Sequence, residues 1–127
     1  MTSTMASERH VAITAKFIDQ NPSDLLLRRR VRTADGAGGF TTAYVDVEGP
    51  VTVRRVLHGG RNGVERVSES GHTVIPQWTL ILMPDADVQL FDQFDFPPYS
   101  QAPHVCEIVW LSDSPPWRLQ AEVYEHG

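Results

Sequence analysis

The segment of residues 81–126 constrains the fold more than any other part of the chain. It contains four short apolar stretches separated by a Pro-Asp turn, a proline-rich loop at 97–103 and a tight Ser-Pro-Pro turn. Short apolar stretches bounded by proline and aspartate are typical of antiparallel β-structure, whereas α/β enzymes alternate strands with long helical patterns. We therefore expect a small antiparallel β-barrel. The segment places no nucleophile beside a base, so we predict an assembly role and no enzymatic activity.

Length and cysteine content indicate one domain that folds in a reducing compartment. The chain has 127 residues, of which 41% are hydrophobic and 21% charged, a globular composition large enough for one core. Cys106 is the single cysteine, which excludes an intrachain disulfide framework. No apolar run has the form of a signal peptide or of a membrane span of roughly 20 residues, so we predict a soluble intracellular product, or one released by lysis.

The N-terminal region predicts a short helix at residues 7–20, after a flexible start at 1–6. Ser7 is a suitable cap and Asn21-Pro22 a suitable stop. The helical spacing i, i+4, i+7 is occupied by Val11, Ala15 and Ile18. The same stretch also alternates between apolar and polar positions from residue 11 to 17, so a strand remains open.

Further strands are expected at residues 25–33, 40–46, 51–57 and 78–83. The glycine-rich stretch 34–39 reads as a turn, because glycine tolerates a positive φ angle. Residues 59–71 are either a hairpin with a short strand at 64–67 or a mobile loop. A loop of this length is often functional, and Arg61 and Arg66 within it are candidates for contact with DNA phosphate or an acidic neighbour.

Charge is distributed unevenly along the chain. Residues 1–66 carry ten basic and seven acidic side chains, a net charge of +3, and residues 67–127 carry one basic and nine acidic side chains, a net charge of −8. In an oligomer, this polarity could orient neighbouring copies. In a monomer, both halves could interleave in one barrel, and the asymmetry would then average out. Both interpretations stay open.

The densest basic patch lies on the strand expected at 25–33. Arg28, Arg30 and Arg32 share one face of that strand, and Arg29 points the other way. As a solvated edge these arginines would resist strand pairing between molecules. In an oligomer they are the obvious partners of a neighbour's acidic half. The acidic pI of about 5.4 argues against a dedicated nucleic-acid binder.

Three patterns resemble ligand sites but do not satisfy their requirements. Asp85, Asp87, Asp92 and Asp95 look at first like a calcium or magnesium loop, yet Leu90 and Phe96 stand where an EF-hand loop needs glycine and glutamate. His104 and Cys106 share a strand face without a second ligand pair, which favours Cys106 as a small buried hydrophobe. The glycines at 59–63 are not followed by a helix that would bind phosphate. We therefore predict no catalytic residue, no metal and no cofactor.

Tryptophans are common anchors of cores and interfaces. Pro115-Pro116-Trp117 leads into a final alternating strand, which suggests that Trp117 folds over the end of the barrel. The candidate contacts with neighbouring subunits or with a channel are Arg28, Arg30, Arg32, Arg61, Arg66, Asp85, Asp87, Asp92 and Trp117.

An ordered series of segments resembles the head-to-tail stopper (head-closure) proteins of long-tailed bacteriophages, especially those of actinobacterial hosts. The series is FIDQNP at 17–22, an Arg-bearing strand, TADGAGGF at 33–40, WTLILMPDADV at 78–88, DQF at 92–94, and a strand before a Pro-Trp turn and a final strand. It covers residues 17–126. The chain departs from the common pattern at Gln93, where a basic residue often follows the aspartate, and in its longer 97–103 loop.

This resemblance implies a small SH3-like β-barrel that forms a homo-oligomeric ring, of six copies by our expectation, in the virion neck. Its partners would be the head-tail adaptor of the portal complex, tail terminator or tail tube proteins, and packaged double-stranded DNA in the channel. The ring would close that channel and provide a platform for the tail, after assembly in the host cytoplasm.

Two alternatives remain open. The first is another neck or minor capsid component, such as a tail terminator, which needs a helix packed on its sheet. The second belongs to a different class: a small cupin-like β-barrel that binds a ligand or depends on a metal.

Overall fold

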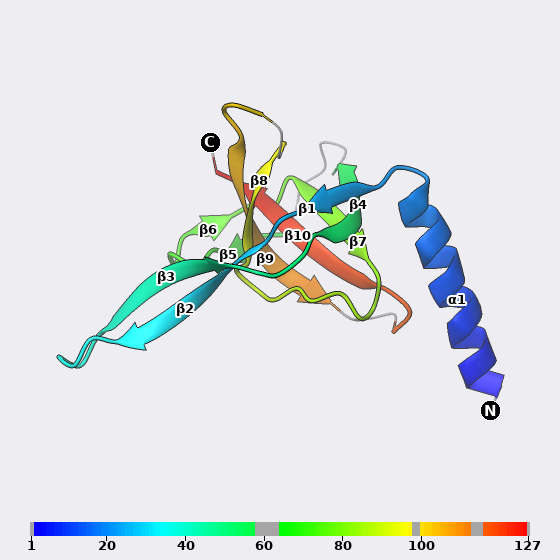
Figure 1. Cartoon of the computed structure of the whole chain (residues 1–127), viewed down its shortest axis with the longest axis horizontal. Coiled ribbons are helices and arrows are strands. Elements are labelled where there is room, and N and C mark those ends of the chain that lie inside the picture. The colour runs from blue at the N-terminus through cyan, green and yellow to red at the C-terminus, as the bar shows by residue number, and fades with distance from the viewer. Residues whose placement is uncertain (1, 58–63, 98–99, 113–115, 127) are drawn as a thin grey trace.

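The computed structural model describes residues 2–57, 64–97, 100–112 and 116–126, with side chains from Glu8 onward. It contains one helix and ten strands in these residues. Figure 1 shows a central β-barrel-like body from which the helix and one hairpin extend on opposite sides. The elements are α1 (Thr2–Asp19), β1 (Ser23–Leu25), β2 (Arg28–Ala34), β3 (Phe40–Asp46), β4 (Val51–Leu57), β5 (Arg66–Val67), β6 (Thr73–Val74), β7 (Trp78–Leu82), β8 (Gln93–Phe96), β9 (His104–Ser112) and β10 (Leu119–Glu125).

Eight strands form one strongly curled antiparallel sheet, in the order β1-β4-β7-β10-β9-β8-β2-β3. β5 and β6 form a separate two-stranded sheet. The expected mainly β fold with a helix at the N-terminal side is therefore confirmed. Within the described residues, β2 joins β8 through the single register pair Arg28 and Gln93, so the β2–β3 hairpin is attached to the body only at its base.

The core lies inside the curl of the sheet. Alternate residues of β7 and β10 point inward, as a period of two requires, so that Leu80, Leu82, Ala121 and Val123 are fully buried. The largest buried side chains are Trp78 and Phe94, whose rings meet edge to face with centroids 5.6 Å apart. Burial of each such side chain contributes about 1.5–3 kcal/mol. This apolar interior holds the sheet in its curled form.

The helix is longer than the sequence predicted. It begins at Thr2, so Ser7 is inside it, and the described backbone from residue 2 is helical where we expected a flexible start. Methionine, alanine and glutamate at residues 5–8 are good helix formers, and their propensity outweighs the cap signal of Ser7. The expected stop is confirmed, because the helix ends at Asp19 and the amide of Asn21 donates to the carbonyl of Ile18 at 3.1 Å. From Glu8 onward, where the side chains of α1 are described, the buried positions are Thr14 and Ile18, four residues apart.

Two expected strands differ from the structure. The strand expected at 25–33 is divided into β1 and β2, which lie at opposite ends of the sheet order. Leu25 and Leu27 are both buried on the two sides of the break, so the chain crosses the core at this point. The strand expected after the Pro-Asp turn is only β8, because residues 83–92 form a loop. The strands at 40–46 and 51–57 have the predicted bounds.

The stretch 59–71 is only partly described. Residues 58–63, which include Arg61, lie outside the described residues. The remainder leads into the short hairpin β5–β6, so the hairpin interpretation is the correct one for this part. In the part of the chain that the structure covers, no helix combines the length and apolar character needed to cross a membrane.

Candidate assembly interface

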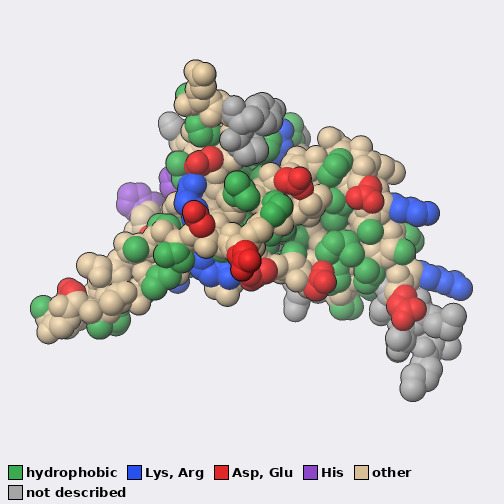
Figure 2. Space-filling view, in the orientation of Figure 1, with side chains coloured by type: hydrophobic (Ala, Val, Ile, Leu, Met, Phe, Trp, Pro, Cys, Tyr) green, Lys and Arg blue, Asp and Glu red, His purple; other side chains and the backbone are tan. Residues whose placement is uncertain are grey.

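The outer part of the β2–β3 hairpin lacks a packing partner of its own among the described elements. We call residues 31–43 the arm. All of them are exposed except half-buried Gly39, and their ladder pairs run from Val31 with Ala43 to Ala34 with Phe40. Figure 2 shows the arm projecting from the body, largely tan and green, with an acidic group near its tip. An isolated two-stranded hairpin is marginally stable in water, so the arm is suited to contact another molecule.

The two faces of the β2–β3 hairpin, which includes the arm and its base, differ in chemistry. Residues directly opposite in the ladder share a face. One face carries Arg30, Arg32 and Phe40. The other face has no charged group beyond Arg29 at its base, and its exposed members are Val31, Thr33, Thr41, Ala43 and Val45.

The outer edge of the arm is also unprotected. β3 is the last strand in the order of the eight-stranded sheet, and its residues 40–45 contain neither a charge nor a proline. Soluble proteins usually block such edges with charges, proline or a covering element. The arm therefore exposes an apolar tip, an uncharged face and an open strand edge. Phe40 is the largest of these side chains and is 66% exposed.

In contrast, the base of the hairpin is held by ion pairs. Arg28 binds Asp95 at 2.9 Å. Arg29 binds both oxygens of Asp92 at 3.2 and 3.0 Å and reaches Asp87 at 3.1 Å. The hydrogen bonds that Arg29 donates to Asp92, together with the negative charge of that carboxylate, raise the pKa of Arg29 above its usual value. Because these partners come from the loop at 83–92 and from β8, the arm leaves the body in a fixed direction.

A second polar junction, made through Arg30, also supports the base of the hairpin. Arg30 lies 3.5 Å from Glu69 and stacks over the ring of Phe91 at 4.7 Å. The buried carboxylate of Glu107 accepts the amide of Glu69 at 2.7 Å and lies 3.0 Å from the Nε2 atom of His126. This junction connects β2, the β5–β6 turn, β9 and the end of β10.

Tyr44 lies next to this junction. Its hydroxyl is buried, and the described residues offer it no hydrogen-bond partner. Burial raises the pKa of Tyr44, so the hydroxyl keeps its proton at neutral pH. Tyr44 is therefore the half-buried residue through which β3 contacts the body, while the other residues of β3 are exposed.

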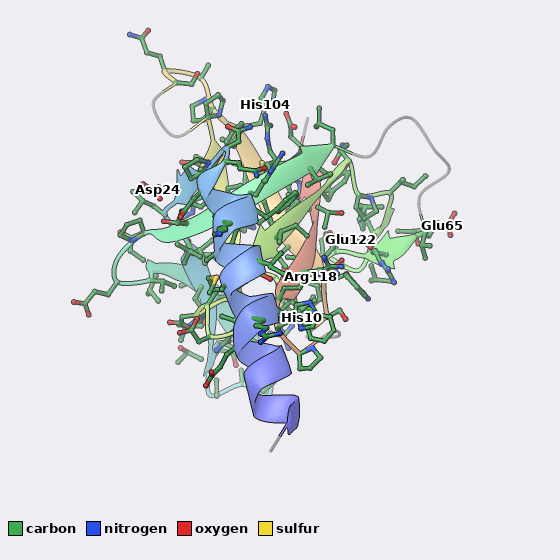
Figure 3. All side chains as sticks on the ribbon, turned by 90° about the vertical axis from the view of Figure 1, so that its right-hand side faces the viewer. His10, Asp24, Glu65, His104, Arg118 and Glu122 are labelled. Atoms are coloured by element: carbon green, nitrogen blue, oxygen red, sulfur yellow. The ribbon has the colours of Figure 1, made fainter. Side chains whose placement is uncertain are left out.

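A second surface lies between α1 and the sheet, on the side of the body away from the arm (Figure 1). This groove has a volume of about 370 Å³. Figure 3 faces it and shows His10 and Arg118 close together at the lower half of the helix. The lining residues are His10, Ile13, Thr14, Phe17, Val56, Thr79, Ile81, Trp117, Arg118 and Gln120.

Contacts along its length hold α1 over the groove. The ring of His10 stacks on Trp117 with centroids 4.2 Å apart, and the Thr14 hydroxyl lies 3.1 Å from the Trp117 carbonyl oxygen. Nearer the C-terminal end of α1, Arg54 lies 3.9 Å from the centroid of Phe17 and donates to the Phe17 carbonyl at 3.0 Å. The groove is thus a formed feature of the fold, with an apolar lining and a basic group at its mouth.

Most described candidates from the basic patch and the acidic loop form pairs within the chain. Arg28, Asp87 and Asp92 belong to the ion pairs at the base of the hairpin. Arg66 binds Glu122 at 2.9 and 3.1 Å and stacks over Trp110. These pairs join the basic and acidic halves, as the interleaved interpretation of the charge asymmetry requires.

The remaining candidates differ in exposure. Arg32 and Asp85 are exposed and therefore accessible to another molecule, whereas Asp92 is only 1% exposed. The expected intersubunit contact of Asp92 stays a prediction, and in the single chain its carboxylate is buried against Arg29. Trp117 packs under α1, where we expected it over the end of the barrel.

The sequence did not reveal which apolar side chains are exposed on the arm and in the groove. Strand and helix patterns place Phe40, Val31 and Val45 in strands and Ile13 in a helix, but they do not indicate that these side chains are exposed. One signal was present: residues 40–45 are uncharged and rich in β-branched and aromatic side chains, with no residue that blocks edge pairing.

Metal and thiol chemistry receive no support from the described residues. Among them, no group of three or more His, Cys, Asp or Glu side chains is arranged to hold a metal ion. Cys106 is fully buried, and this burial raises the pKa of its thiol to about 12. The thiol is therefore protonated and inert in the folded chain.

Comparison with known protein families and with curated proteins found no match to this chain. The arm and the groove are therefore the surfaces of the described chain from which a function can be inferred.

Proposed function

We propose that this protein is a non-enzymatic structural subunit of a virion neck, in which copies associate into a ring between the portal-adaptor complex and the tail. The observation that carries the proposal is the arm. It exposes an apolar tip, an uncharged face and an open strand edge while its base is fixed to the body. A surface of this kind is stabilised when a protein partner covers it, and without a partner it promotes aggregation.

The biological setting of this proposal comes from the sequence, in which an ordered series of segments resembles head-closure proteins. The partners in that setting are further copies of the chain, the adaptor, and tail terminator or tail tube proteins. Packaged DNA would pass through the ring without sequence-specific contact. A net charge of −5 agrees with this role, because an acidic subunit does not hold the DNA backbone tightly.

The test of self-association is a shortened arm. Val31 and Ala43 are directly opposite in the ladder, so residues 32–42 can be replaced by Asn-Gly, which closes a two-residue hairpin. We expect the shortened chain to keep its circular dichroism spectrum, because the core lies elsewhere, and to lose oligomers in light scattering. A control variant with Gly36 and Ala37 replaced by Asn-Gly keeps the arm length and should still assemble.

The test of the neck role is made in particles. Antibody labelling should place the protein at the head–tail junction, and loss of its gene should leave filled heads without tails. A protein that never appears in virions, with heads and tails joined in its absence, would contradict the proposal.

A tail-terminator-like subunit is the second candidate. It is favoured by one observation: α1 packs on β4 and β7 of the sheet, as a terminator requires of its helix. The position of the label distinguishes the two, since a terminator remains on isolated tails and a head-closure subunit remains on isolated heads.

A further inference from the structure

We infer that the arm of one copy docks, through Phe40 at its tip, into the groove beneath α1 of a second copy. This inference rests on the proposed self-association of the chain, but not on the proposed location of that assembly in a virion. It assigns a partner surface to the arm and an occupant to the groove.

The positions of the two surfaces are the first argument. The arm and α1 extend from opposite sides of the body (Figure 1). A contact between two different surfaces of the same chain is heterologous, so a pair of copies retains one free arm on one copy and one free groove on the other. Such contacts close into rings when the rotation between neighbours permits, which is the form of assembly proposed above.

The fit of size and polarity is the second argument. Ile13, Phe17 and Val56 line the groove and are among the exposed large apolar side chains of the chain. An apolar cavity of roughly 150 Å³ accommodates a benzene ring, and the groove measures about 370 Å³. It therefore has room for the ring of Phe40 together with neighbouring tip atoms. Docking would cover apolar surface on both partners at once.

Charge is the third argument. Asp35 is the only acidic residue of the arm and lies beside Phe40 at the tip, where the ladder ends with Ala34 and Phe40. Its carboxylate accepts the amides of Ala37 and Gly39 at 2.8 and 3.1 Å, which lower its pKa and keep it ionised. The groove contributes Arg118. Attraction between Asp35 at the tip and Arg118 would orient the contact.

Cross-linking through introduced cysteines tests the contact in the full-length chain. Cys106 is buried and inert, so the background reaction is low. Thr41→Cys beside Phe40 and Gln120→Cys in the groove lining leave Phe40 and the apolar lining in place, and these two variants are mixed and treated with a short bis-maleimide. We expect covalent dimers at least tenfold above the yield from either variant alone. Ile75→Cys, an exposed position outside the arm and the groove, is the control partner for Thr41→Cys and should give background yield.

A chain that carries both Thr41→Cys and Gln120→Cys separates this contact from other modes of assembly. Each copy then has one reactive arm and one reactive groove, so we expect a ladder of covalent oligomers and not dimers alone. Efficient dimers from Thr41→Cys by itself would indicate pairing between two arms through their open edges, and would overturn the inference.

Substitutions give a readout without cross-linking. Phe40→Asp removes the apolar tip, and Arg118→Glu reverses the charge at the groove. Each should raise the concentration needed for half-assembly at least tenfold, measured by light scattering. Lys16→Glu, an exposed change on α1 outside the groove, should leave that concentration within twofold.

The outcomes separate this inference from the proposed function. Assembly that needs the arm but ignores Phe40→Asp and Arg118→Glu would refute the groove as the docking site while leaving ring formation intact. A wild-type chain that remains monomeric at millimolar concentration would overturn both the self-association and the inference. Stoichiometric retention of a small molecule in the groove, with assembly unaffected by its release, would also exclude the arm as occupant.

Discussion

β9 and β3 are strands of one sheet, yet they meet opposite environments. In β9, the four consecutive residues Cys106 to Val109 are buried, because neighbouring strands flank it and both of its faces are covered. In β3, six of seven residues are exposed, Tyr44 is half-buried, and no residue is fully buried. Local sequence made both segments strands. Their position in the sheet order, central for β9 and terminal for β3, determined which one became core.

This contrast indicates two functions within one fold. The body is stabilised by its own interior, so it folds without assistance. The arm contributes little to that interior and exposes the side chains on which association would depend. Substitutions should therefore divide into those that unfold the body and those that alter only assembly.

The largest expected difference is between two phenylalanines. Phe94 is fully buried and Phe40 is 66% exposed. Phe94→Ala should lower the free energy of unfolding by about 3–5 kcal/mol, through lost burial and a new cavity. Phe40→Ala should change it by less than about 0.5 kcal/mol in the dilute monomer. Urea denaturation of both variants measures the two changes in the free energy of unfolding. Equal losses of stability would show that the arm is part of the core.

The next comparison lies at the base of the hairpin, where Arg29 binds two aspartates. Asp92 is buried and also accepts the amide of Gln89 at 2.9 Å, whereas the side chain of Asp87 is 68% exposed. Asp92→Asn should cost about 2–4 kcal/mol of stability, because it leaves a partly buried guanidinium short of its main partner. Asp87→Asn should cost less than about 1 kcal/mol, as for other exposed pairs. Thermal unfolding of the two variants decides this, and the reverse order would contradict the assignment of Asp92 as the anchor.

A smaller and more local effect is expected for α1. Trp117→Ala removes the stacking partner of His10 and loosens the helix above the groove. We expect amide hydrogen exchange in α1 to accelerate at least tenfold, which corresponds to about 1.4 kcal/mol. Amides of β9 and β10 should keep their protection. Uniform acceleration across the body would show that Trp117 belongs to the main core.

The smallest effect concerns pH at the tip of the arm. Hydrogen bonds from the amides of Ala37 and Gly39 lower the pKa of Asp35. Its contribution to the turn is therefore complete above the ordinary aspartate pKa of about 4 and is lost as the pH falls through the lowered value. Amide NMR shifts of Ala37 and Gly39 should follow this titration, and Asp35→Ala should abolish it. A midpoint above the ordinary value would contradict the observed geometry.

Several features of the fold could be predicted from the sequence because their causes are local. Alternation and turn residues predicted the bounds of β3 and β4 correctly. Asn21-Pro22 predicted the end of α1, because proline disfavours helix in the residue before it. Leu119 to Tyr124 alternated as expected, with Ala121 and Val123 pointing inward.

Other features could not be predicted from the sequence, because they depend on contacts between residues that are distant along the chain. The strand pattern at 25–33 gave no sign that the chain changes from one side of the sheet order to the other between Leu25 and Arg28. The arginine stripe was read correctly as two faces, but its partners are 39 to 67 residues away along the chain. Pairing over such separations is decided by the curl of the sheet and not by spacing.

The sequence alone determined that the chain would form short antiparallel strands around one apolar core, since hydrophobic period and turn chemistry act within a few residues. Only the tertiary structure decided which strands became central and which became an exposed arm. It also decided that α1 lies across β4 and β7 to form a groove, and that Asp92 is buried while Phe40 is exposed. The physical reason is that burial is a property of the whole arrangement of strands, and a residue's own neighbours in sequence do not specify it.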